Sequence, residues 1–365
     1  MWLKVLSSTS FFLITLIVSP VYVSARPKPV FYSSQVNKLE LNDLLLAGQQ
    51  YVEEKNYEQA LSTYKQAADL DQNNPQIFSG IGYVQTLRKN YAAATEAYQQ
   101  AIDLSPNNPK LYFALGFALG SAGDNRAAAT AYEKAIELEP DNLQNHFGLA
   151  VVLTRAEKYE QAIAVYQNIL TLAPDNQQAA KIASHILIEQ QRYPEAIALL
   201  ENVLQQQPYA SDLRLQLAIA LLNQGEETAG LEALALAKKT APQNHLIYLQ
   251  TASILYQQGE YQEALAEYKW AARLQPDSSR AIAGIGQVYL AQQNYSRAII
   301  AFRQLTEVDP NNPDGYHNLG IALNGRNRDK EAIAILNQAL KLYKSNGDQK
   351  QANQVSKLIK KIDQL

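Results

Sequence analysis

Histidine is the residue type in this chain with the most direct route to chemistry, because it binds metals and transfers protons near neutral pH. The 365 residues include no cysteine and four histidines, at His146, His185, His245 and His317. These histidines fall in different units of a 34-residue repeat, and packed helices lie about 10 Å apart. They therefore cannot converge on one metal ion, and we expect no metal site and no cofactor.

Two glycine-rich fragments look at first like pieces of a nucleotide-binding loop. Gly80-Ile81-Gly82 and Gly284-Ile285-Gly286 both fall inside a predicted helix, where glycine more often allows two helices to pack closely. The sequence contains neither a P-loop nor a Gly-x-Ser-x-Gly elbow. Because no group of residues supports catalysis, we do not expect an enzyme.

The elements that hold these residues recur with a fixed period. Prolines stand at a constant 34-residue spacing, at Pro106, Pro140, Pro174, Pro208, Pro242, Pro276 and Pro310. A constant period of this length predicts a tandem array of similar helical units. Nine such 34-residue blocks fit between residues 41 and 346 without a gap. Small residues recur at two places in each block, which lets its two helices approach closely.

Each block is predicted to form two helices. In the third block, residues 111–120 are apolar on most faces, and Gly123-Asp124-Asn125 then breaks the pattern. Residues 128–138 form an amphipathic helix, and Pro140 ends it. Asn-Asn-Pro sequences supply a cap and a first helical residue at 73–75, 107–109 and 311–313.

The blocks resemble tetratricopeptide repeats, whose pattern places Leu-Gly, a Tyr, then Ala, an aromatic residue, Ala and Pro at fixed positions. The ninth and seventh blocks carry this pattern well, with Tyr316-His317-Asn318-Leu319-Gly320 and with Tyr261, Ala264, Tyr268, Ala271 and Pro276. The resemblance covers residues 41–346. It implies an all-α fold, a right-handed superhelical α-solenoid of tandem helix-turn-helix repeats.

The fifth and sixth blocks depart from the pattern. Leu200 and Leu234 replace aromatic rings, and Gly230 replaces an alanine. Glycine lowers helix propensity by about 1 kcal/mol relative to alanine. We therefore hypothesise that the array bends or softens around residues 226–234.

The resemblance also implies where partners bind. In tetratricopeptide arrays the first helix of each unit lines a concave groove, and the fifth, ninth and twelfth places of the block point into it. In this chain the candidate groove residues are Tyr83, Phe113, Phe117, Phe147, Val151, Lys181, His185, Leu215, Ile219 and Leu249. We expect them to bind one or more proteins or peptide segments.

The aromatic rings among these residues have two interpretations. Phe113, Phe117 and Phe147 either form a patch for the apolar side chains of a partner or pack against the neighbouring first helix as core. A ligand with a C-terminal carboxylate is disfavoured, because Lys181 and His185 would have to hold it in a groove where Asp212 adds a like charge.

The N-terminus has the anatomy of a secretory leader. Lys4 precedes the apolar run 11–18, and Val23-Ser24-Ala25 follows as a small-residue cleavage signal. The run is shorter than the about 20 residues that span a bilayer. We expect a signal peptide over residues 1–25, a linker and helix lead-in over 26–40, and export to the periplasm or the extracellular space. If the source is photosynthetic, the thylakoid lumen is an alternative destination. If the leader is not cleaved, it serves as a membrane anchor.

Charge argues against a nucleic-acid partner. The formal net charge of −3 lacks the basic footprint that such partners require. A last helix is predicted from Gln349 to Gln364, inside a C-terminal capping segment at 347–365. Its lysines are Lys350, Lys357, Lys360 and Lys361. We interpret this helix as a polar cap on the open end of the array, with contact to an anionic surface as the alternative.

These features together predict a non-enzymatic scaffold that binds other proteins outside the cytoplasm. One alternative is an assembly factor or chaperone for a membrane-associated complex, which would work close to a membrane. Another is a regulatory interaction subunit of an exported enzyme. Self-association through the open ends of the array is also left open.

Overall fold

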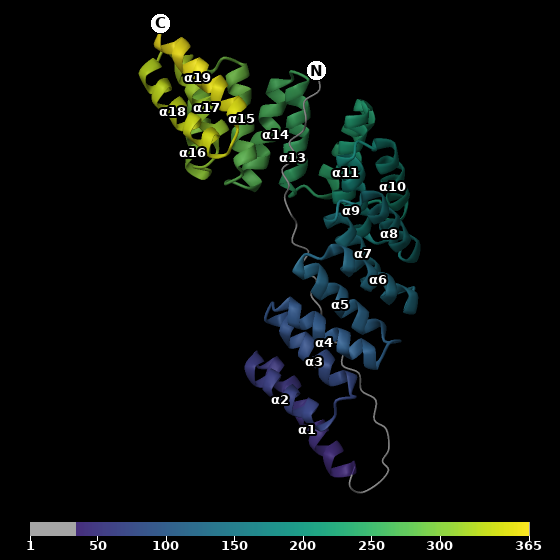
Figure 1. The fold of residues 1–365 in the computed structure, drawn as a ribbon. Coiled ribbons are helices and arrows are strands. Elements are labelled where there is room, and N and C mark those ends of the chain that lie inside the picture. The colour runs from purple at the N-terminus through teal and green to yellow at the C-terminus, as the bar shows by residue number, and fades with distance from the viewer. Residues whose placement is uncertain (1–33, 365) are drawn as a thin grey trace. The chain divides into compact units, whose positions relative to one another are not determined.

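The computed structural model describes residues 34–364, and all of their regular elements are helices (Figure 1). The chain divides into two compact units, residues 1–105 and 106–365, which we call unit 1 and unit 2. The helices of unit 1 are α1 (Ser34–Glu53), α2 (Tyr57–Leu70), α3 (Pro75–Leu87) and α4 (Tyr91–Leu104). Those of unit 2 are α5 (Pro109–Ala122), α6 (Asn125–Leu138), α7 (Leu143–Arg155), α8 (Tyr159–Leu172), α9 (Gln177–Glu189), α10 (Tyr193–Gln206), α11 (Ser211–Gln224), α12 (Glu227–Thr240), α13 (His245–Gln257), α14 (Tyr261–Leu274), α15 (Ser279–Ala291), α16 (Tyr295–Val308), α17 (Pro313–Asn324), α18 (Asp329–Ser345) and α19 (Gln349–Asp363).

Each predicted 34-residue block contains one pair of these helices, so we number the pairs as repeats 1–9, from α1 and α2 to α17 and α18. The predicted break after residue 122 separates α5 from α6. The predicted last helix is α19, which ends one residue earlier than expected. Helix α1 begins at Ser34, inside the segment predicted as linker and helix lead-in. The predicted signal peptide, residues 1–25, lies outside the described residues, as do residues 26–33.

Asparagine and proline begin the first helix of several repeats. The side chain of Asn74 accepts a hydrogen bond from the Gln76 N–H at 3.0 Å, and Asn108 accepts one from the Lys110 N–H at 3.1 Å. The next residue in each case is a proline. Proline has no N–H, so the first position of the helix has no donor that needs a partner. At the other end of α5, Gly123 has φ of 94°, a left-handed conformation that closes the helix without strain. The start and stop signals read from the sequence are therefore confirmed.

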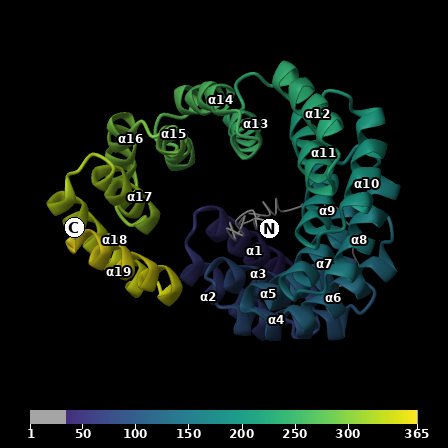
Figure 2. The same ribbon diagram turned by 90° about the horizontal axis from the view of Figure 1, so that it is seen from above.

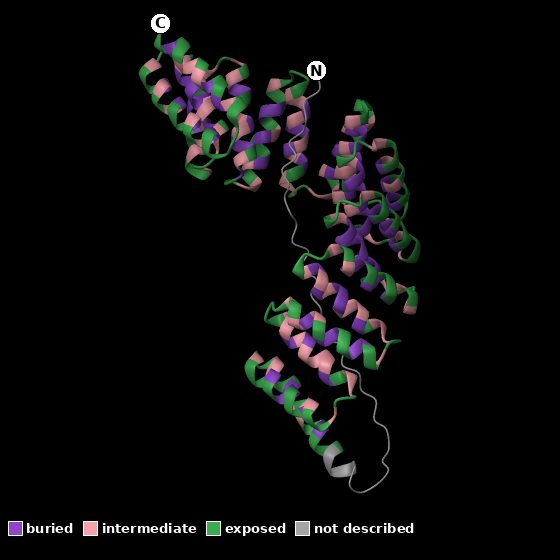
Figure 3. Ribbon diagram, viewed as in Figure 1, coloured by how far each residue is buried: buried purple, intermediate pink, exposed green. Residues whose placement is uncertain are grey.

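In unit 2 the two helices of each repeat lie in separate layers. The first helices α7, α9 and α11 lie side by side, and the second helices α6, α8 and α10 form a layer behind them (Figure 2). Buried residues face the space between the layers, and exposed residues cover the outer sides (Figure 3). One side of each first helix is thus left to face outward from the core.

An aromatic ring packed between glycines fixes the spacing between layers. Tyr132 on α6 is 2 % exposed. A Cβ added at Gly116 or Gly148 would lie only 3.0 Å or 2.3 Å from atoms of its ring. Gly80 and Gly284 meet Tyr64 and Tyr268 in the same way, at 2.7 Å and 2.4 Å. These glycines allow close packing, so the interpretation of the two glycine-rich fragments as packing sites is confirmed.

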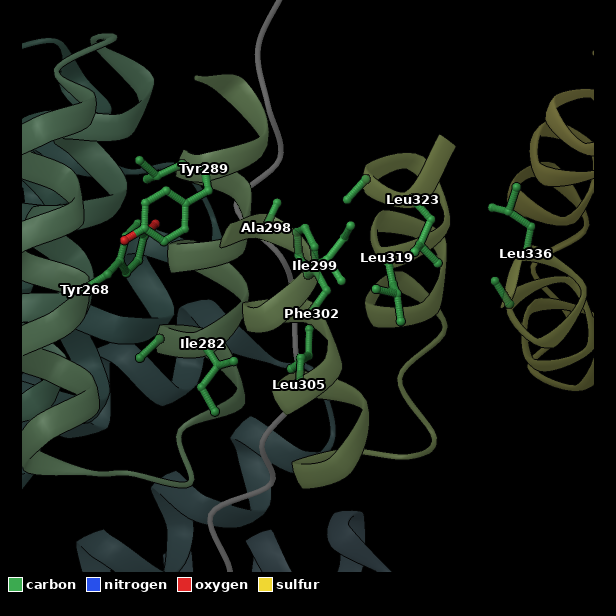
Figure 4. Packing of buried hydrophobic residues seen from close by; sticks show 14 of the residues in the cluster. Tyr268, Ile282, Tyr289, Ala298, Ile299, Phe302, Leu305, Leu319, Leu323 and Leu336 are labelled. Carbon is green, nitrogen blue, oxygen red and sulfur yellow. The ribbon is translucent and has the colours of Figure 1, made fainter. Parts of the chain in front are cut away.

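The C-terminal part of unit 2 has one continuous apolar core. It runs from Leu249 on α13 to Ile362 on α19, and Phe302 and Leu336 are fully buried within it (Figure 4). The apolar side of α19 covers the last repeat through Ala352 and Val355, while its lysines remain exposed. In the described part of the chain, no helix combines the length and apolar character needed to cross a membrane.

Alkaline pH is expected to destabilise the fold through its buried tyrosines. Burial raises the pKa of Tyr98 and Tyr166 to about 12, above the ordinary value of 10. The folded state then keeps a proton that the unfolded state loses, so stability is constant below pH 10 and falls as pH rises from 10 to 12. Each tyrosine should cost about 1.4 kcal/mol per pH unit in that window. Urea unfolding across the window measures this slope, and Tyr166→Phe should make it shallower.

Candidate functional site

The three phenylalanines of the predicted groove differ in how they pack. On α5, Phe113 meets Tyr132 edge to face, with ring centres 5.6 Å apart and an angle of 68°. On α7, Phe147 meets Tyr166 in the same way, at 6.3 Å and 67°. Both rings pack against the apolar core of repeats 3–5. Each nevertheless stays half-buried, because its other side faces away from the core.

Phe117 differs from the other two rings in its contacts. It is half-buried, it does not pack against the core of repeats 3–5, and it has no edge contact with a tyrosine within residues 34–364. It lies one turn after Phe113 on the same face of α5. The interpretation of the rings as a patch for a partner stays a prediction, and Phe117 is its main candidate. Phe113 and Phe147 each contact this core and a tyrosine ring, whereas Phe117 does neither within residues 34–364.

The other apolar candidates are not equally accessible. Val151, Leu215 and Ile219 are half-buried on α7 and α11. Leu249 is only 8 % exposed and belongs to the core of α13–α19, so it offers a partner little surface. Tyr83 lies on α3 in unit 1 and is half-buried, and burial is the main cause that raises its pKa. The expectation that Leu249 lines a groove does not fit its burial.

The polar candidates neutralise one another. Lys181 Nζ on α9 lies 2.6 Å from Asp212 Oδ2 on α11, and both side chains are about half exposed. Asn244 Nδ2 donates to the other carboxylate oxygen of Asp212 at 3.3 Å. One turn further along, the Ser184 hydroxyl donates to the Gln216 side-chain oxygen. His185 is exposed beside them. Lys181 is already paired with the carboxylate of Asp212, so its charge does not favour a second carboxylate from a ligand.

The histidines lie apart in the structure. The His146 ring donates to the Pro140 carbonyl at 2.7 Å, and the His317 ring meets Tyr343 edge to face at 6.1 Å. Burial lowers the pKa of His317, and Asp314 opposes that shift. Within residues 34–364, no three His, Cys, Asp or Glu side chains gather as metal ligands would.

Sequence reasoning missed a polar cluster where repeat 6 meets repeat 7. Lys238 on α12 pairs with Glu267 on α14 at 2.5 Å, and Tyr248 on α13 stacks on Trp270 of α14. The repeat pattern contained a signal for this cluster. The residues 34 positions before Lys238 and Glu267 are Leu204 and Ala233, so charged residues stand at two repeat positions that are apolar in the preceding repeat.

Comparison with known families agrees with the observed repeats. Family models described as tetratricopeptide repeat match residues 187–252, 249–313 and 283–347, and one described as TPR repeat matches residues 48–87 and 83–123. A model of anaphase-promoting complex, cyclosome, subunit 3 matches residues 121–203. Among curated proteins, no sequence matches the chain significantly.

Solved structures share the fold at low sequence identity. The crystal structure of yeast Tom70 has a TM-score of 0.51 and 13 % identity, over 90 % of this chain and 97 % of that one. A tetratricopeptide repeat protein from Parabacteroides merdae has a TM-score of 0.50 and 19 % identity, over 69 % of this chain and 99 % of its own. Such identities show likeness of fold alone. Together with the family matches and the nine helix pairs, they show that the chain belongs to the tetratricopeptide repeat family, an α-solenoid family of proteins that generally serve as interaction scaffolds.

Proposed function

We propose that this protein is a non-enzymatic scaffold that binds partner segments along the first helices of repeats 3–6. The observation that carries the proposal is Phe117, a half-buried ring with no edge contact to a tyrosine in the described part of its array. Phe113 exposes part of its ring one turn away on the same helix. Two adjacent half-exposed rings suit an apolar or aromatic side chain of a partner, because such rings bury large area at little entropic cost.

The polar part of the same surface limits what the partner carries. Lys181 and Asp212 satisfy each other's charge, and an exposed pair of this kind contributes at most about 1 kcal/mol. A partner with an acidic C-terminus gains no free cation there. The fitting partner is an extended or helical segment whose recognition comes from apolar side chains, with Val151, Leu215 and Ile219 continuing the apolar track.

The sequence supports a place of action outside the cytoplasm. A charged start, a short apolar run and a small-residue signal precede the array. An exported scaffold would hold its partners in lasting complexes. An assembly factor for a membrane-associated complex would instead be found on immature forms of it, and a regulatory subunit would accompany an exported enzyme. The exposed lysines of α19 would favour the membrane-proximal alternative.

Site-specific crosslinking in the native cells tests this proposal. A photo-crosslinking phenylalanine analogue is placed at position 117, and in a matched variant it is placed at Ile300, a 69 % exposed residue of α16. We expect position 117 to form a discrete adduct with a partner and Ile300 to form none, since only the former lies on a first helix of repeats 3–6.

The composition of the adducts then separates the roles. A partner present in stoichiometric amounts in the mature complex supports a scaffold, and a partner found only before assembly supports an assembly factor. Equal adducts from both positions, or none from position 117 in folded protein, would contradict binding at this surface.

A further inference from the structure

The packing of unit 2 changes at the junction between α12 and α13. These two helices contact each other more sparsely than any other consecutive pair in unit 2. The apolar core also divides here. Ile247 and Ile254 of α13 pack with the core of α9–α12, whereas Leu249 and Ala252 belong to the core that continues to α19. One helix thus carries the apolar contacts of both sides.

The second helices meet across this junction through charge instead of apolar packing. At the places of Lys238 in the three preceding repeats stand Ile136, Leu170 and Leu204. At the places of Glu267 stand Val165, Leu199 and Ala233. All six of these apolar residues pack in or against the two core clusters that cover repeats 3–6. At the junction of repeats 6 and 7 an ion pair takes their place.

The ion pair is largely buried, so the cost of desolvating its charges leaves it little net stabilising effect. The side chains of Lys238 and Glu267 are only 26 % and 19 % exposed. Glu267 Oε1 accepts from Lys238, but Oε2 is buried without a hydrogen-bond partner among the described residues. Desolvation of two charges can cancel their attraction when hydrogen bonding is incomplete. The pair therefore defines one closed arrangement without stabilising it strongly.

Stacked rings complete the contact. Tyr248 and Trp270 stack with centres 6.2 Å apart and an angle of 30°. Lys238 Nζ lies 5.4 Å from the Tyr248 ring centre, and the Arg273 guanidinium lies 5.0 Å from that of Trp270. Trp270 remains 50 % exposed. The order Arg273, Trp270, Tyr248, Lys238 and Glu267 forms a column across α12, α13 and α14, which we call the clasp.

We propose that the α12–α13 junction is a hinge held closed by the clasp, so that repeats 3–6 and repeats 7–9 move as two bodies when the Lys238–Glu267 pair breaks. The hinge accounts for the thin packing, the divided core and the charged pair at one place. It does not depend on which partner the groove binds. Phe117 and Phe147 lie on one side of it, so its opening changes how far a bound segment can extend past repeat 6.

Distance measurement between spin labels tests the hinge, because the chain has no cysteine to interfere. Exposed Asn202 on α10 and Gln304 on α16 are changed to cysteine and labelled as the pair that spans the junction. Glu133 and Asn202 form the control pair within repeats 3–5. We expect Glu267→Gln to broaden the distances of the first pair and to leave the control pair unchanged. Trp270, the one tryptophan within residues 34–364, should shift its emission to longer wavelength in the same variant.

The reverse variant distinguishes a hinge from general loosening. Lys238→Leu together with Glu267→Ala reproduces Leu204 and Ala233 of the preceding junction. This variant should hold the distances across the junction as narrow as those of the control pair, because apolar packing then replaces the ion pair. The hinge is wrong if Glu267→Gln leaves the spanning distances unchanged, or if it broadens the control pair as much as the spanning pair, while the helical signal is intact.

Discussion

Replacing Tyr132 by alanine is expected to lower the free energy of unfolding by about 3–5 kcal/mol, the usual cost of removing a buried ring. The ring is 2 % exposed and lies between Gly116 and Gly148, which have no side chains to fill the space it would leave. Phe113 would also lose its edge-to-face partner. The cavity would therefore open between repeats 3 and 4 and weaken both.

Urea unfolding of Tyr132→Ala, followed by circular dichroism, measures this loss. Tyr132→Phe is the matched control, because it keeps the ring and should cost far less. Gly148→Ala provides a second check, since its Cβ would lie 2.3 Å from the ring, and overpacking of this kind costs about 1–3 kcal/mol. That penalty should shrink when Tyr132 is already alanine. A small loss for Tyr132→Ala would mean that neighbouring side chains collapse into the space.

The double change Phe117→Ala and Phe147→Ala is expected to weaken partner binding by about 2–4 kcal/mol, the range of aromatic anchors at interfaces. The two rings occupy the same surface on α5 and α7, which pack on each other. Because Phe147 also contacts Tyr166, removing its ring will also lower the free energy of unfolding. Phe117→Ala alone should reduce affinity with little change in unfolding.

Titration calorimetry with the partner identified by crosslinking measures the two affinities. Ile300→Ala is the matched control, since it removes a 69 % exposed apolar side chain elsewhere and should leave binding unchanged. If Phe117→Ala unfolds the protein without altering affinity in the folded fraction, the ring is core and the recognition surface lies elsewhere.

Local features of the fold were predictable because their causes are local. Asn108 and its following proline begin α5, and Gly123 ends it, through contacts with near neighbours in the sequence. The 34-residue period then extends those boundaries to every repeat. The hypothesis of a soft segment at 226–234 stays a prediction, and the proposed hinge lies after it, at the α12–α13 junction. Helix α12 is continuous through Gly230, where Leu222 occupies the space that a Cβ would need.

The candidate site was less predictable, because exposure depends on residues far away in sequence. A repeat position indicates which face a side chain shares, but not how much of it the next helix covers. Phe113 and Phe117 stand one helical turn apart, and only the first meets Tyr132. Leu249 is buried because α13 packs on α14 and α15. Lys238 and Glu267, distant in sequence, show their pairing only in three dimensions.

The position of Tyr132 between two glycines has a consequence for how such arrays gain and lose repeats. Gly116 belongs to the same 34-residue block as the ring, but Gly148 belongs to the next one. An in-frame deletion of residues 143–176 would keep every proline in step and still bring Ile182 to the place of Gly148. The unit that can be deleted without a steric clash is therefore not one 34-residue block, because the ring of one repeat needs the glycine at the start of the next repeat. A deletion that keeps the 34-residue period can still destabilise the protein at that one position.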